Sequence, residues 1–220
     1  MKFLNTNTIK AISLAVLAGM ALTGCNDVLD DNVNVDRAHE NTADLGLPPF
    51  IFFANQIVYD HSEYGIYLSQ CLTTMGKNQI GDRTYKYGWG NFLKMQRHPQ
   101  WRRHFYDIGV NGNELIANSQ KLGSPNYELI ARTVMLMSTQ LTTDMFGDMP
   151  REEAYKTNSP HYDTQASIYA WMFEEAENLI AMYNDPAIVN SPDNRDIPAK
   201  RDRIYAGDLN KWKGLVLAVK

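Results

Sequence analysis

Cysteine is almost absent from this sequence of 220 residues, which contains only Cys25 and Cys71. Two cysteines cannot form the multi-disulfide framework that stabilises many small exported domains. Hydrophobic residues make up 44% of the chain and aromatic residues 11%, a composition typical of one globular domain with a sizeable core. The fold is therefore expected to depend on side-chain packing.

The sequence also lacks a long apolar run, because no stretch after residue 24 approaches about 18 uninterrupted apolar residues. A shorter apolar stretch over residues 11–22 follows a basic start at Lys2 and leads through Leu-Thr-Gly into Cys25. This layout resembles a bacterial lipoprotein signal, residues 1–24, which would leave Cys25 as the site of lipid attachment. An ordinary secretory signal or an uncleaved anchor is the alternative. Cleavage would leave 196 residues with a net charge of −6, because it removes Lys2 and Lys10.

No segment of useful length alternates apolar and polar residues, so strands are not expected. Helical spacing is clearest over residues 124–145, where one face carries Ile130, Val134, Met137, Leu141 and Met145. Ser124 is expected to supply the N-cap oxygen of this helix, Pro125 its first residue and Gly147 a left-handed C-cap.

Further helices are predicted at 164–183 with Asp163 or Thr164 as the cap, near the C-terminus after Asp208, and around 101–115 and 50–73. The helices at 124–145 and 164–183 should pack antiparallel, with residues 151–162 lying across the pair. Consecutive pairs of this kind predict an all-α, tetratricopeptide-like architecture, although no strict repeat is visible.

Motifs for several chemistries are missing. The five histidines include no pair four residues apart, Cys71 has no ligand-spaced partner, and no glycine-rich phosphate loop occurs, so no metal or cofactor is expected. Glu152–Glu153 and Glu174–Glu175 are adjacent carboxylates that diverge by about 100° on a helix, so glycosidase activity is not expected. Glu174 and Glu175 are instead predicted to lie on a solvated face. The acidic net charge also argues against a nucleic-acid partner, and solvated basic residues on helix faces account for the Arg and Lys among the aromatics.

Seven segments agree in order with one known family, the SusD/RagB-like nutrient-binding lipoproteins of the Bacteroidota. They are the lipobox at Cys25, Asn34–Asp36, Ala131–Thr133, Thr143–Pro150, Glu153–Tyr155, Pro160–Tyr169 and Asp202–Lys213. The most specific is the Asp-Met-Phe-Gly-Asp-Met-Pro turn followed by acid-Ala-Tyr. On this basis the chain resembles the N-terminal portion of a longer SusD-like protein and is expected to be truncated, because its end departs from the family's continuation.

The resemblance implies a palmitate-bearing outer-membrane lipoprotein at the cell surface, with a lipidated tether at 25–45 and a helical domain at 46–220. It also implies a binder, not an enzyme, which captures oligosaccharides and passes them to a TonB-dependent, SusC-like transporter. Acidic residues after Cys25 are consistent with surface export, although a tether that only repels anionic headgroups has the same composition. Two alternatives remain: a helical scaffold lipoprotein in outer-membrane assembly, and a family member that binds peptides.

Sugar contacts are expected in the loop at 84–91, which carries two glycines and exposed aromatics. Its position resembles that of the loop with a stacking Trp and nearby Asn in the starch-binding family member. The predicted ligand-binding residues are Tyr85, Tyr87, Trp89 and Asn91. In the alternative reading, the two tyrosines only brace the loop. Trp101, farther along, is predicted to belong to the core.

Overall fold

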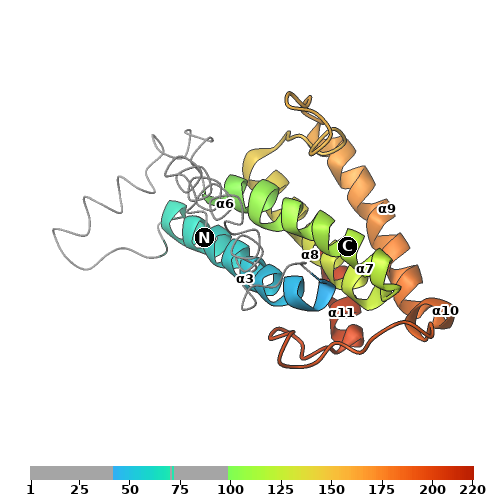
Figure 1. Ribbon diagram of the computed structural model, residues 1–220. Helices are drawn as coiled ribbons and strands as arrows, with labels where there is room; N and C mark the ends of the chain where they lie inside the picture. The colour runs from blue at the N-terminus through green and yellow to red at the C-terminus, as the bar shows by residue number, and fades with distance from the viewer. Residues whose placement is uncertain (1–41, 70, 72–98) are drawn as a thin grey trace, which may run out of the picture. The chain divides into compact units, whose positions relative to one another are not determined.

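The computed structural model describes residues 42–69, 71 and 99–220 (Figure 1), which fall within the unit Asn41–Lys220. Its helices are α3 (Ala43–Leu68), α6 (Pro99–Arg102), the π-helix η2 (Arg103–Val110), α7 (Asn111–Leu122), α8 (Pro125–Phe146), α9 (Gln165–Asn184), α10 (Pro186–Val189) and α11 (Leu209–Val219). No strand occurs in this part of the chain, where Met149 and Asp163 form a single isolated bridge. The all-α prediction is confirmed.

Helix α3 is one continuous helix where the sequence left open one or two. It begins at Ala43, seven residues before the start expected at residue 50, and Ala43 and Leu47 are buried. Pro48 and Pro49 lie inside the helix, beyond its first turn, so each removes one i→i−4 backbone hydrogen bond. Its buried face continues through Phe50 to Ile57.

Residues 99–122 run through α6, η2 and α7 without a break, as the spacing from Trp101 to Leu115 predicts. The eight-residue π-helix in the middle was not predicted, because a helical pattern does not distinguish i→i+5 from i→i+4 bonding. Gly112 brings α7 close to α8, since a Cβ there would lie 2.6 Å from the sulfur of Met135. Arg103 ties η2 to α3 through an ion pair with Asp60, so the prediction that such basic residues are merely solvated is wrong at this position.

Helix α8 contacts α3, α7, α9 and α11 and supplies much of the buried core (Figure 1). Pro125 opens it as predicted, but the Ser124 hydroxyl does not cap it. That hydroxyl instead donates to Asn194 Oδ1 and accepts from Arg195 N, and the Asn194 oxygen accepts from Asn126 N at 3.2 Å. The cap therefore comes from a side chain 70 residues away in sequence from Ser124. Gly147 ends the helix at φ +78° and ψ −124°, a positive φ outside the left-handed helical region that was predicted.

Helix α9 packs antiparallel to α8, as predicted. The Thr164 hydroxyl caps it by accepting from Ser167 N. Gln165, at the start of α9, bonds Thr143 near the end of α8, whereas Tyr183, near the end of α9, bonds Thr133. Arg132 bonds Glu175 through Nε and Nη2 at 2.7 and 2.8 Å. The prediction that Glu175 lies on a solvated face is therefore wrong, because periodicity alone does not show which charges meet a partner helix.

The segment after α10 returns the chain to α8 and α9, which both contact α11. The Asp208 carboxylate caps α11 as predicted, by accepting from Asn210 N and Lys211 N, and Trp212 and Val216 are fully buried. In the described ranges, none of the helices is sufficiently long and apolar to traverse a bilayer.

Candidate functional site

The connector, residues 147–164, joins α8 to α9 as a closed loop whose two limbs are held at the base. Met149 and Asp163 exchange backbone hydrogen bonds of 3.2 and 3.1 Å. Below that bridge, Asp148 Oδ1 accepts from Gln165 N at 2.8 Å, and the Gln165 amide donates to the Thr143 carbonyl at 2.7 Å. The Asp-Met-Phe-Gly-Asp-Met-Pro motif therefore fixes how both helices meet the connector.

Asp163 also organises the limb that faces it. Its Oδ2 accepts from the backbone N–H groups of Arg151 at 2.8 Å and Glu152 at 2.9 Å. Burial by itself would raise the pKa of this carboxyl, but the two N–H groups and His161 hold the pKa below its usual value. The residues between these limbs are thus presented from a defined frame.

An aromatic groove of about 610 Å³ lies between η2 and the connector. Trp101, Phe105, Tyr106 and Val110 line it from the helical side; Pro150, Ala154, Tyr155, Asn158, Ser159, Pro160 and Tyr162 line it from the connector. Tyr106, Tyr155 and Tyr162 are 68%, 48% and 57% exposed. The groove therefore offers open ring faces, and Asn158 and Ser159 place polar groups among them.

Trp101 lies at the junction of the groove and the core. Its ring contacts Phe105 and Phe146 with centroids 4.7 and 5.4 Å away, and it stacks on Tyr162 at 6.2 Å with an interplanar angle of 21°. The predicted assignment to the core is thus incomplete, because Trp101 packs against the core while lining the groove.

Tyr155 is held in an unusual position. Its backbone adopts φ +68°, which is uncommon for a bulky side chain and costs about 1–3 kcal/mol. The hydroxyl end lies in a notch at Gly109, where a Cβ atom would be only 1.7 Å from the phenol oxygen. Burial of this end raises the pKa of the Tyr155 hydroxyl although half of the residue is exposed. Strain of this kind persists where the surroundings over-determine a conformation, which is common at binding sites.

A second cavity, of about 500 Å³, is also lined by Tyr155 and lies against α8 and α9. His104 lines it and is buried, with Nδ1 2.8 Å from Ser138 Oγ. Burial lowers the pKa of His104 to about 4, so this imidazole is neutral at physiological pH. Arg151 also lines this cavity, with its guanidinium 4.8 Å from the Trp171 ring centroid.

The predicted contacts Tyr85, Tyr87, Trp89 and Asn91 and the predicted lipidation site Cys25 all lie outside the described residues. Sequence reasoning did not assign Tyr155 and Tyr162 to a site. The signal was present, because both lie within segments of the family-like pattern. A pattern that indicates family membership does not show which rings remain exposed, however. Their exposure depends on the closed connector.

The adjacent carboxylates considered for catalysis have different surroundings. Glu175 is bonded to Arg132, Glu153 lies beside His161, and Glu174 is exposed on α9. The groove brings together ring faces and amide or hydroxyl groups, which are the groups that binding sites use for stacking and hydrogen bonding.

Comparison with known proteins gives a family and a fold. A family model for SusD-like proteins, described as starch-binding associating with outer membrane, matches residues 51–220. A crystal structure of a SusD/RagB family protein from Bacteroides thetaiotaomicron, solved at 1.75 Å, is similar with a TM-score of 0.55 and 20% identity. The match covers 80% of this chain and 36% of that one, so the chain spans about a third of the length of this relative. No curated protein matches the sequence.

Proposed function

The chain belongs to the SusD-like family, and on that premise we propose that it binds glycans in the aromatic groove and delivers them to a TonB-dependent, SusC-like transporter. The observation that carries the proposal is the open aromatic wall formed by Tyr106, Tyr155 and Tyr162 beside Trp101. Sugar rings present flat C–H faces that stack on aromatic rings, and their hydroxyls bond amide and hydroxyl groups such as those of Asn158 and Ser159.

The predicted loop contacts belong to the same proposal. Tyr85, Tyr87, Trp89 and Asn91 are proposed as further sugar contacts, on the strength of their composition and their resemblance to the family's stacking loop. They precede α6 in the sequence, and α6 carries Trp101.

The location is proposed from the N-terminal signal and from the family description. Lipid on Cys25 would hold the protein at the outer membrane, where a surface-exposed binder meets oligosaccharides before a transporter does. Radioactive palmitate should label the wild type and not the Cys25→Ala variant. Equal labelling of both would exclude Cys25 as the acylated residue.

The groove is tested by affinity electrophoresis of the full chain in gels that contain soluble polysaccharide, beginning with starch. Binding should retard the wild type, and Tyr106→Ala and Tyr162→Ala should each weaken it about 3- to 10-fold, because each removes one stacking face. Phe173→Ala is the matched control, since Phe173 is 51% exposed on α9 and does not line the groove. Retardation that is unchanged in both tyrosine variants would reject the groove as the site.

Separate variants test the loop. Trp89→Ala and Tyr87→Ala should also reduce retardation, and unchanged mobility would remove these residues from the proposal. Binding to immobilised peptides in place of polysaccharides would establish the peptide-binding alternative.

The partner is tested by affinity purification of the lipidated protein from detergent-solubilised outer membranes. Co-purification of a large TonB-dependent barrel would support delivery to a transporter. Recovery of an outer-membrane assembly complex in its place would favour the scaffold alternative.

A further inference from the structure

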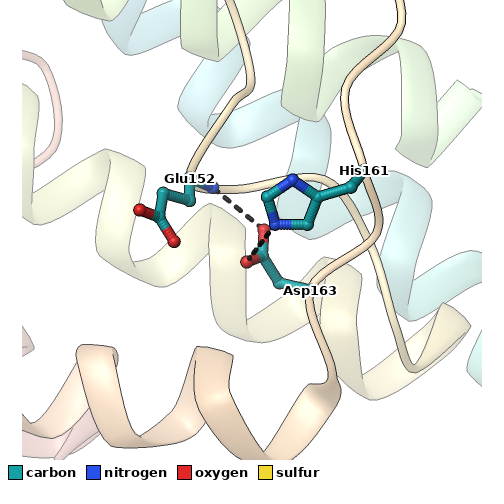
Figure 2. Close-up of side chains that lie close together, drawn as sticks. All are labelled: Glu152, His161 and Asp163. Carbon is teal, nitrogen blue, oxygen red and sulfur yellow. Dashed lines mark hydrogen bonds and ion pairs between the residues drawn. The ribbon is translucent and has the colours of Figure 1, made fainter.

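Three potential metal ligands meet on the two limbs of the connector (Figure 2). Glu152 comes from one limb and His161 and Asp163 from the other, and one ligand atom of each lies within 4.8 Å of the other two. His161 Nε2 is 3.3 Å from Asp163 Oδ1. Ligands at about 2.0–2.2 Å from a tetrahedral zinc ion lie about 3.4 Å from one another, so this pair already has ligand spacing.

Groups outside this set orient two of the three ligands. His161 Nδ1 lies 3.0 Å from Glu153 Oε2, so its N–H can donate to that carboxylate and leave Nε2 to face Asp163. Histidine ligands nearly always donate their second ring N–H in this way. Asp163 is fixed by the Arg151 and Glu152 N–H groups, which bind Oδ2 and leave Oδ1 toward the imidazole.

We propose that Glu152, His161 and Asp163 bind a zinc ion, with water as the fourth ligand. One imidazole nitrogen and two carboxylate oxygens suit zinc, whereas calcium requires six to eight oxygen ligands. Glu152 is exposed, so rotation of its side chain can close the remaining distance. The spacing of histidines in the sequence gave no sign of this site, because its ligands include one histidine and depend on the closed connector.

Zinc at this position would cross-link the two limbs of the connector above the Met149–Asp163 bridge. Tyr162 lies between two of the ligands in sequence, so the ion would also fix the backbone that carries this groove residue. A protonated His161 paired with carboxylates produces the same distances without metal, and the experiment must separate the two.

Isothermal titration of zinc chloride into the chelator-treated full chain provides the test. The wild type should bind zinc at a site whose affinity falls at least tenfold in His161→Ala and Glu152→Gln, and about tenfold in Glu153→Gln, which loses only the orienting group. Glu152→Gln changes an exposed side chain and should leave the fold intact. Glu174→Gln, an exposed carboxylate on α9, is the control and should bind like the wild type.

Two further readouts accompany the titration. Zinc should raise the thermal midpoint of the wild type and not that of His161→Ala, and cobalt should give the visible absorption of a four- or five-coordinate ion in the wild type only. Zinc binding that is absent from the wild type, unchanged in His161→Ala or Glu152→Gln, or equally weakened in Glu174→Gln would overturn the site.

Discussion

At the scale of single residues, His104 makes stability depend on pH. Burial lowers its pKa to about 4, whereas an unfolded histidine has a pKa near 6.5. Between these values the unfolded chain binds more protons than the folded one, so the free energy of unfolding should fall as the pH drops from about 6.5 to 4. The full contribution is about 3 kcal/mol.

His104→Asn keeps a polar atom near Ser138 and removes the titration. Urea denaturation at several pH values should show a shallower loss of stability for this variant than for the wild type over that range. Carboxylates titrate in both proteins and cancel in the difference. Parallel curves would mean that His104 does not carry the pH dependence.

Gly109 and Tyr155 should be strongly coupled. A Cβ at residue 109 would lie 1.7 Å from the Tyr155 oxygen, so Gly109→Ala must displace the phenol, at about 1–3 kcal/mol. In a Tyr155→Ala background that clash is gone. Gly109→Ala should there stabilise the fold by about 0.5–1 kcal/mol, because alanine has the better helix propensity. The added Cβ would also lie 3.0 Å from the His104 carbonyl oxygen, but this contact is common to both backgrounds and cancels in the double-mutant cycle. Additive unfolding free energies would contradict the packing of Tyr155 in the Gly109 notch.

At the scale of helices, α9 carries one partly buried ion pair, with α8, and one exposed ion pair, with the end of α11. Glu175 and Arg132 keep 13% and 22% of their side chains exposed and form two hydrogen bonds, and the bond to Glu175 raises the pKa of Arg132. Glu175→Gln should lower the free energy of unfolding by about 2 kcal/mol, because it removes charge-assisted bonds at an interface.

Glu177→Gln is the matched control on the same helix. Glu177 pairs with Lys220, but its side chain is 61% exposed, so the loss should be below about 0.5 kcal/mol. Urea denaturation measures both. Equal losses would mean that the α8–α9 pair contributes no more than a surface contact.

The helices also show what a sequence can and cannot predict. Thr164 and Asp208 cap the helices that they precede, because a local cap needs only the next few residues. Ser124 has the same local pattern, but tertiary contacts take its hydroxyl and bring Asn194 to the helix end. Local spacing therefore predicts the helices, and contacts distant in sequence decide which side chains complete them.

The groove follows the same rule at the scale of the whole molecule. The family-like segments were visible in the sequence, and the pairing of helices followed from their order. The groove required the connector to fold back on η2, which places Tyr162 against Trp101 although the two residues are far apart in the chain. That approach depends on the Asp163 hydrogen bonds and the Gly109 notch, neither of which has a periodic signature.

Asp202 links the last helix to the rest of the molecule, and its loss should destabilise the whole domain. The fully buried carboxylate accepts from Ile204 N, Tyr205 N and Gly207 N and from Trp212 Nε1, at 2.8–3.2 Å. Asp202→Asn turns an amide N–H₂ toward two of these donors, so the free energy of unfolding should fall by about 3–5 kcal/mol. Because α11 contacts both α8 and α9, tryptophan fluorescence, to which buried Trp212 contributes, and far-UV dichroism should report one shared, earlier urea transition. Asp196→Asn, at an exposed position in the same segment, should change stability by less than about 0.5 kcal/mol, and a similar small change at Asp202 would refute its role.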